Sequence, residues 1–242
     1  MYIVVSEDKN ELGEKAAEKG AALINNTIAE KGSANIILAT GKSQFEMLCA
    51  LIRKNIDWER TICFHLDEYI GLPITHPASF RKYLKERFVD KVSPGKFYYI
   101  NGEADAQKEC LRLENLITTC SIDVAFVGIG ENAHLAFNDP PADFTTERSY
   151  IKVDLDENCR KQQLGEGWFT SLDEVPKSAI SMSIKQILKS KHIICSVPEV
   201  RKAKAVQLVV EGEVTPEIPS SILKEHPDVL LFLDKSSASL LK

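Results

Sequence analysis

Two segments of the sequence carry side chains that could move protons near neutral pH. In the first, LDEYIGL at positions 66–72, the adjacent carboxylates Asp67 and Glu68 follow an apolar run. Adjacent residues of an extended chain point to opposite sides, so we expect one of the two to face a ligand. A solvated loop that turns at Gly71 is the alternative interpretation.

The second segment, 128–141, places His134 between Asn132 and Asp139. Histidine titrates near neutrality, and a neighbouring carboxylate can orient its ring for proton transfer. The third glycine of a dinucleotide fingerprint is missing, so the segment does not predict a nucleotide cofactor. We interpret His134 as a functional residue. His65 lies inside a strand pattern and is expected to be a packed core histidine.

A third segment could bind an anion. Residues Thr40, Gly41, Lys42 and Ser43 lie between an apolar run and a helical pattern. The N-terminus of a helix presents unpaired N–H groups and a partial positive charge, which makes this loop a candidate phosphate cradle. The alternative is that Ser43 is a plain helix cap.

Two cationic side chains are further candidates for an anion contact. Lys202 begins a helical pattern directly after a strand pattern, so its ammonium and the helix N-terminus could act together. Arg160 lies in the weakly patterned region that follows residue 148. Either one could instead be an ordinary surface charge.

The elements that must position these residues alternate along the whole chain. Strand-like and helix-like segments follow one another, which predicts an α/β fold: one domain over residues 1–242, with a doubly wound, mostly parallel sheet and helices on both faces. Ligands of such sheets bind beyond the carboxyl ends of the strands. The expected strands are 2–5, 35–39, 61–66, 95–100, 124–127, 179–182, 192–197 and 229–233, and the expected helices are 11–29, 45–52, 79–88, 104–120, 185–189 and 202–210.

Composition excludes several classes of protein. The 242 residues are 44% hydrophobic and 27% charged, with a formal net charge of −5. This argues against a disordered chain and against a nucleic-acid binder, which needs a basic face. No apolar run is long enough for a membrane helix, and the N-terminal pattern is not that of a signal peptide. The six cysteines are scattered, which favours a cytoplasmic protein with free thiols over a zinc site or a disulfide framework.

These motifs, taken in order, resemble the glucosamine-6-phosphate deaminases, also called glucosamine-6-phosphate isomerases. The resemblance extends from about residue 35 to residue 234. It rests on ATG at 39–41, LDEYIGL at 66–72, the serine and aromatic pair at 79–80, and VGIGENAHLAFNDP at 127–140.

The resemblance implies ring opening of an amino-sugar 6-phosphate, aldose-to-ketose isomerisation and loss of ammonia, without a metal or an organic cofactor. It implies that Asp67 moves a proton between C2 and C1 and that His134 opens the ring. Asn132 and Asp139 would tune His134. The phosphate would be held by Thr40, Gly41, Lys42, Ser43, Arg160 and Lys202.

The resemblance further implies a mobile lid over about 148–175, and it leaves the oligomeric state open between a monomer and a homo-oligomer. The chain departs from the family pattern at several places. Asn132 stands where many members have aspartate, Ala133 replaces a glycine, Asp139 is shorter than the usual glutamate, and Lys42 replaces a glycine. The segment 164–169 is richer in glycine than the family's lid, which favours a hinge.

Three other functions stay open on the sequence alone. The first is a 6-phosphogluconolactonase on the same scaffold, which also needs a phosphate site and a histidine. The second is an isomerase for galactosamine 6-phosphate or another sugar phosphate. The third is a catalytically silent regulator that binds a sugar phosphate, although pure binding does not require a carboxylate poised as a base.

Overall fold

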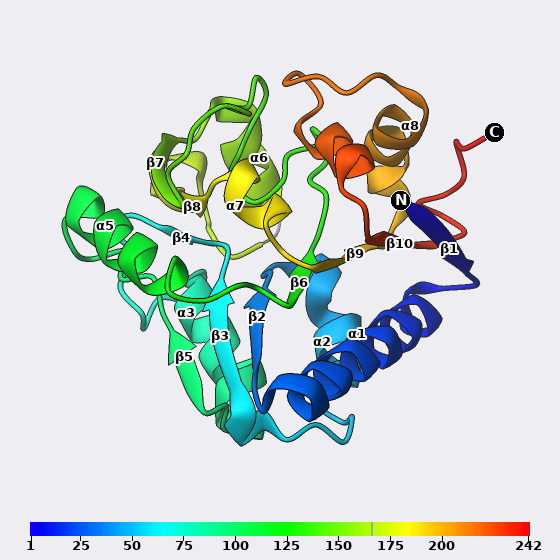
Figure 1. The fold of residues 1–242 in the computed structure, drawn as a ribbon. Helices are drawn as coiled ribbons and strands as arrows, with labels where there is room; N and C mark the ends of the chain where they lie inside the picture. The colour runs from blue at the N-terminus through cyan, green and yellow to red at the C-terminus, as the bar shows by residue number, and fades with distance from the viewer. Residues whose placement is uncertain (166) are drawn as a thin grey trace.

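The structure, a computed structural model, describes residues 1–165 and 167–242. Within these residues, seven parallel strands form a central sheet in the order β1-β10-β9-β6-β2-β3-β5 (Figure 1). The strands are β1 (Tyr2–Ser6), β2 (Ala34–Leu38), β3 (Thr61–His65), β5 (Lys96–Tyr98), β6 (Val124–Val127), β9 (His192–Val197) and β10 (Val229–Asp234). The predicted α/β fold is confirmed.

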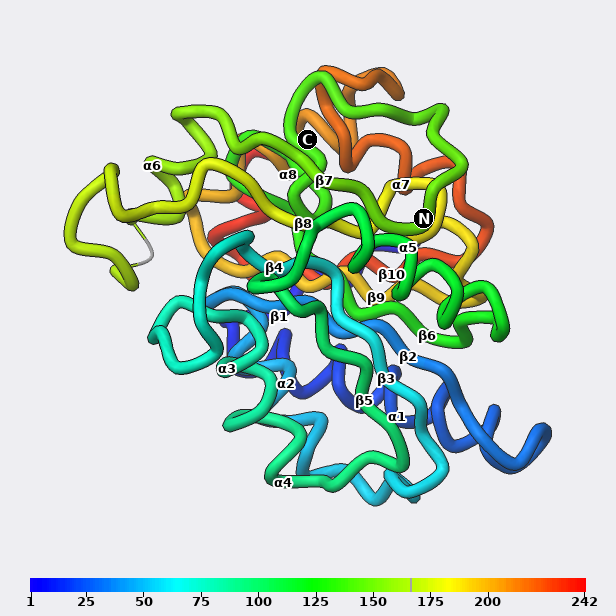
Figure 2. Tube along the Cα trace, turned by 90° about the vertical axis from the view of Figure 1, so that its left-hand side faces the viewer, coloured from blue at the N-terminus to red at the C-terminus, as the bar shows by residue number. Residues whose placement is uncertain are grey.

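Helices cover both faces of this sheet, as expected (Figures 1 and 2). The α-helices are α1 (Lys9–Lys31), α2 (Phe45–Leu51), α3 (Phe80–Leu84), α4 (Asp90–Val92), α5 (Ala106–Ile117), α6 (Glu157–Gly165), α7 (Ile184–Leu188) and α8 (Ala203–Glu211). One apolar core lies between the sheet and α1, α2 and α3. A second core lies on the opposite face, under α5, α7 and α8.

Helix α1 shows how local sequence determines an element. Asp8 begins it, because its carboxylate accepts hydrogen bonds from the backbone N–H groups of Asn10 and Glu11. Gly32 ends it in the left-handed conformation with φ of 85°. Gly20 lies so close to the sheet that a Cβ there would meet the Phe126 ring at 2.4 Å, which lets the helix pack directly on β6.

A second, antiparallel sheet was not predicted. It consists of β4 (Asp67–Tyr69), β8 (Ser178–Met182) and β7 (Tyr150–Asp154), in that order. Strand β4 follows β3 after Leu66 alone, and all of its residues are buried, so it shows no alternation that would reveal a strand. The region after residue 148, which appeared weakly patterned, supplies β7 and α6.

The order of the strands defines where a ligand can bind. From β2 the chain continues through β3 to β5, whereas β6 pairs with the other side of β2 and leads toward β9 and β10. This reversal between β2 and β6 opens a crevice at the carboxyl ends of both strands. The backbone N–H of Ala39 donates to Phe126 at 3.0 Å and fixes the base of the crevice.

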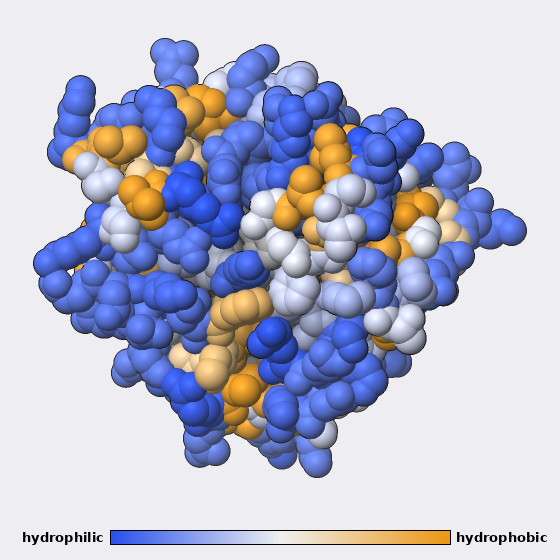
Figure 3. All heavy atoms as spheres, turned by 180° about the vertical axis from the view of Figure 1, so that it is seen from behind, coloured by the Kyte–Doolittle hydropathy of each residue, from blue (hydrophilic) through white to orange (hydrophobic). Residues whose placement is uncertain are grey.

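In the described residues, no helix has both the length and the apolar character to cross a bilayer. The face of the molecule shown in Figure 3 is largely hydrophilic, and its apolar side chains form small, separate groups.

Candidate active site

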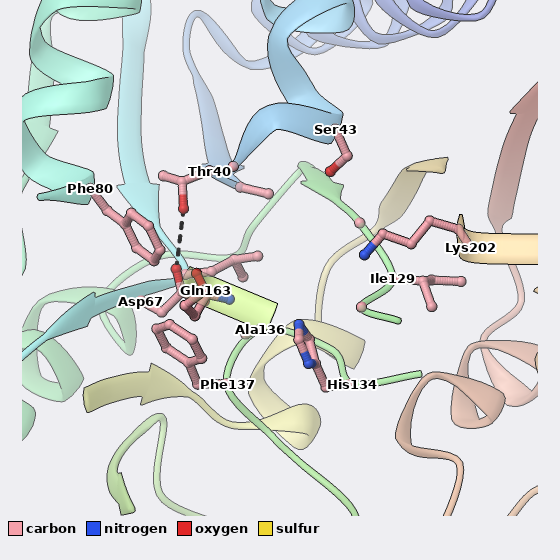
Figure 4. Close-up of a pocket in the computed structure, with 15 residues that line it drawn as sticks. Thr40, Ser43, Asp67, Phe80, Ile129, His134, Ala136, Phe137, Gln163 and Lys202 are labelled. Carbon is pink, nitrogen blue, oxygen red and sulfur yellow. Dashed lines mark hydrogen bonds between the residues drawn. The ribbon is translucent and has the colours of Figure 1, made fainter. Parts of the chain in front are cut away.

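A cavity lies at the reversal point of the sheet, and the loops that follow four strands line it. These loops contribute Thr40 after β2, Asp67 after β3, His134 after β6 and Lys202 after β9. The atom-free space amounts to about 550 Å³, part of it open to solvent. The prediction that these loops share one edge of the sheet is confirmed. In Figure 4, Thr40 and Asp67 face His134 and Lys202 across the cavity.

The two adjacent carboxylates have opposite environments, as the extended backbone of β4 requires. Asp67 lines the cavity, whereas Glu68 points into the protein and does not reach it. The Glu68 carboxylate accepts hydrogen bonds from the Ser79 hydroxyl at 2.9 Å and from the backbone N–H of Arg81 at 2.8 Å. The Arg81 guanidinium also contacts it, at 3.2 Å. These donors satisfy Glu68 and leave Asp67 as the carboxylate that can react.

Asp67 has few partners, and this determines its acidity. Burial, followed by repulsion from Glu68, raises the pKa of Asp67 to about 8. The hydroxyl of Thr40, at 3.5 Å from Oδ1, opposes this shift. A carboxylate with a pKa near neutrality is a stronger base than an ordinary aspartate and can both take up and return a proton.

His134 is held by a small polar network behind the cavity. Its Nδ1 lies 3.2 Å from Oδ1 of Asp139, which leaves Nε2 for the cavity. Asn132 donates from Nδ2 to the same Asp139 oxygen at 3.0 Å and accepts from the backbone N–H of His134 at 3.1 Å. Burial acts to raise the pKa of Asp139, but its contacts with His134, Asn132 and Cys159 outweigh that effect and hold the pKa below its usual value.

The backbone around His134 is strained. Ala133 and Ala136 have φ values of 65° and 52°, in the left-handed region that favours glycine. Such a conformation costs an alanine about 1–2 kcal/mol. Gly130 lies against the imidazole, because a Cβ there would meet the ring at 2.3 Å. The loop therefore fixes the position of the ring through strain and close packing.

The predicted anion cradle lies at the other end of the cavity. Thr40, Gly41 and Ser43 line it, with Gly41 in a glycine conformation at φ of 96°. Ser43 lies in the 3-10 helix η1 (Lys42–Gln44), and no side chain caps α2, so the helix-cap interpretation of Ser43 is wrong. Lys202 ends the 3-10 helix η5 (Val200–Lys202) and is 4% exposed. Figure 4 shows its ammonium and the Ser43 hydroxyl facing the same part of the cavity.

Two of the predicted phosphate ligands lie elsewhere. The guanidinium of Arg160 donates to the backbone carbonyls of Leu172 and Val175, at 3.1 Å for Val175, and Arg160 is not among the described residues that line the cavity. Its contacts hold α6 to the 3-10 helix η4 (Leu172–Glu174), so it supports the predicted lid. Lys42 is also absent from the described lining and extends toward Gly167.

Three of the lining residues that were not predicted as site residues carry aromatic or amide side chains. Phe80 and Phe137 line the cavity beside Asp67 and stack on each other with centroids 5.8 Å apart. Gln163 reaches the cavity from α6, and its side-chain oxygen accepts from the Tyr69 hydroxyl at 2.7 Å. The serine and aromatic pair at 79–80 was a signal for Phe80, but no pattern in the sequence indicated Gln163. Its neighbour Glu166, within the predicted glycine-rich hinge at 164–169, lies outside the described residues.

Comparisons with known proteins agree with this geometry. The profile of the family described as "Glucosamine-6-phosphate isomerases/6-phosphogluconolactonase" matches residues 7–231. The chain is 38% identical to a glucosamine-6-phosphate deaminase of Bacillus pumilus, over 99% of this chain and 100% of the relative. It also resembles the solved structure of a monomeric glucosamine-6-phosphate deaminase, with a TM-score of 0.91 and 34% identity, covering 99% of this chain and 100% of that one.

A solved 6-phosphogluconolactonase of Trypanosoma brucei has the same fold. Its TM-score is 0.82 over 100% of this chain and 98% of that one, but the identity is 16%. This likeness extends to the fold alone.

We predict that Asp67→Asn stabilises the protein at alkaline pH. Asp67 has a pKa of about 8 when folded and an ordinary, lower pKa when unfolded, so its burial costs stability as pH rises from about 4 to about 8. Asparagine carries no charge, so the variant should gain up to about 5–6 kcal/mol in unfolding free energy at pH 8.5 and converge with the parent near pH 4. Denaturant unfolding at both pH values measures this difference.

Asp154→Asn, at an exposed position, is the control and should change little at either pH. A loss of stability at pH 8.5 in the Asp67 variant would contradict the prediction.

Proposed function

This chain belongs to the family of glucosamine-6-phosphate isomerases and 6-phosphogluconolactonases, and we propose that it converts glucosamine 6-phosphate and water to fructose 6-phosphate and ammonia. The observation that carries the proposal is that Asp67, His134 and Lys202 line a single cavity. The identity of 38% to a glucosamine-6-phosphate deaminase supports this activity over the other members of the family.

In this proposal the phosphate anchors the substrate. The loop from Thr40 to Ser43 presents backbone N–H groups and hydroxyls, and Lys202 adds a buried positive charge. A dianion bound there supplies binding energy that orients carbons far from the phosphate. With the phosphate at this end, C1 and C2 lie between Asp67 and His134.

The chemistry then divides between two residues. His134 transfers a proton between the ring oxygen and the C1 hydroxyl, so that the C1–O5 bond breaks and the aldehyde forms. Asp67 removes the proton from C2 and delivers it to C1, while a second proton passes from the amine nitrogen to O1, which leaves a C1 alcohol and a C2 imine. Water adds to the imine and ammonia leaves, giving the ketose. Phe80 and Phe137 exclude water from the carboxylate while it holds the proton.

Asp139, Asn132 and Gln163 have supporting roles that follow from their contacts in the structure. Asp139 contacts Nδ1 of His134 and fixes the direction of the ring, and Asn132 orients both of them by hydrogen bonds. Asn132 cannot carry a charge, so Asp139 is the counterion of the pair. Gln163 would contact the substrate beside Asp67 through its amide group.

The proposal places the reaction in the cytoplasm, where sugar phosphates are made and consumed. All six cysteines are free thiols in the structure, which suits a reducing compartment.

We predict that incubation with glucosamine 6-phosphate yields ammonia and fructose 6-phosphate in equal amounts. Coupled enzymatic assays of both products measure this, and galactosamine 6-phosphate is the matched epimer. Release of ammonia from the galactose epimer alone would change the substrate assignment. If no ammonia forms from either epimer while 6-phosphogluconolactone is hydrolysed rapidly, the lactonase is the correct function.

We predict that Asp67→Asn abolishes exchange of the C2 proton with solvent while substrate binding survives. NMR in heavy water follows the exchange, and calorimetry follows the binding. In the parent enzyme, kcat/KM should rise with pH through a region near 8, because the carboxyl must be ionised to act as a base. Unchanged exchange in the variant would remove Asp67 from this role.

We predict that Lys202→Ala weakens substrate binding by about 1.5–3 kcal/mol, the usual contribution of a charge-assisted contact. Inhibition by inorganic phosphate should weaken by a similar factor. Arg160→Ala is the comparison, and it should leave phosphate inhibition nearly unchanged, since its guanidinium binds backbone carbonyls. Equal losses in both variants would restore Arg160 to the phosphate site.

A further inference from the structure

A cluster of three metal-ligating side chains lies behind the cavity, on the side of His134 away from the substrate. His134, Asp139 and Cys159 each offer one ligand atom, and these atoms lie within 4.8 Å of one another. The nearest pair is Nδ1 of His134 and Oδ1 of Asp139, at 3.2 Å. His134 and Asp139 belong to the loop after β6, whereas Cys159 comes from α6. Their distance in the chain explains why cysteine spacing predicted no metal site.

Two atoms of this cluster lack a hydrogen-bond partner. Within the described part of the chain, Nδ1 of His134 and Oδ2 of Asp139 are both buried and form no hydrogen bond that meets geometric criteria. The side chains of His134 and Asp139 are 12% and 10% exposed, and Cys159 is 1% exposed. Nδ1 of His134 faces Oδ1 of Asp139 at 3.2 Å without forming a hydrogen bond, so Nδ1 and Oδ2 can each accept a further ligand.

We propose that His134, Asp139 and Cys159 form a binding site for a thiophilic divalent cation, with Zn²⁺ as its best occupant. Imidazole nitrogen, carboxylate oxygen and thiolate sulfur are all ligands that Zn²⁺ binds in proteins, and water can take the fourth position. Ligand atoms on a tetrahedral zinc ion lie about 3.3–3.6 Å apart, as follows from bond lengths of about 2.0–2.3 Å. The most widely separated pair of ligand atoms therefore needs to approach by about 1.2–1.5 Å at most. Binding releases the thiol proton as the zinc–sulfur bond forms.

Such a cation would inhibit the enzyme, a consequence that rests on the proposed function. Zinc on Nδ1 would separate His134 from Asp139 and prevent the ring from taking up and releasing its proton. The same ion would join α6 to the loop after β6 through Cys159, which holds the predicted lid in one position. A metal ion bound at this site would therefore act directly on His134, the residue that opens the ring.

Calorimetric titration of Zn²⁺ into the chelator-treated protein tests the site without any substrate. We expect one equivalent to bind, and Cys159→Ser to weaken the affinity by at least about tenfold, since even changes around a metal site cost that much. Cys49→Ser is the control: Cys49 is exposed and distant from the cluster, so its loss should alter neither zinc affinity nor basal activity. Absence of binding, or equal affinity in the parent and the Cys159 variant, would overturn the proposal.

Cobalt supplies a spectroscopic readout of the sulfur ligand. Co²⁺ should give a thiolate-to-cobalt charge-transfer band in the parent and in Cys49→Ser but not in Cys159→Ser. If Cys159→Ser fails to fold, Asp139→Asn is titrated instead, and its affinity should also fall at least about tenfold. A band that persists in Cys159→Ser, or disappears in Cys49→Ser, would refute the assignment.

Different experimental results would contradict the zinc site and the deaminase activity. If zinc binding depends on Cys159 but the protein releases no ammonia from any amino-sugar phosphate, the proposed metal site stands and the proposed deaminase activity is rejected. In an active enzyme, zinc should stop turnover reversibly, with restoration by a chelator and reduced sensitivity in Cys159→Ser. Turnover that zinc at saturating binding leaves unchanged would remove the inhibitory role.

Discussion

The arrangement of this site depends on the burial of two adjacent carboxylates on opposite sides of one short strand. A buried charge is costly unless it is paired and hydrogen-bonded. Glu68 meets that requirement through Ser79, Arg81 and backbone N–H groups. Asp67 does not, because its described hydrogen bond is the long contact with Thr40. The unequal partnering satisfies Glu68 inside the protein and leaves Asp67, with its raised pKa, facing the cavity.

The histidine opposite Asp67 is controlled by a different constraint. Its loop adopts left-handed backbone at two alanines and packs a glycine on the ring, so the imidazole position is built into the backbone. Asp139 and Asn132 then restrict the direction of Nδ1. Departures from the family pattern at Asn132, Ala133 and Asp139 are accommodated in this network. A shorter carboxylate still reaches the ring, and an amide fills the place of a second acid by donating to it.

The region after residue 148 is the part of the chain whose elements and contacts the sequence did not predict. Its strand β7 pairs with β8 of the small sheet and contacts α5, and its helix α6 packs on η4 and a small apolar cluster, so neither has the central sheet as its main partner. Arg160 was placed at the phosphate because its type and approximate position fitted the family. The fold instead directs its guanidinium to carbonyls of the same region. Gln163, an ordinary polar residue by sequence, reaches the cavity because α6 turns that face inward.

The sequence by itself determined the alternation of strands and helices, the edge at which the loops meet, and the choice of Asp67, His134 and the loop at 40–43 as candidates for one site. These depend on local periodicity and on residue type, which a single chain displays. Tertiary structure alone decided which cations reach the cavity, which aromatic rings line it, and that Cys159 meets His134 and Asp139. Those outcomes depend on contacts between residues that are distant in the chain, and the direction of a side chain across such a contact follows from the packing of whole elements.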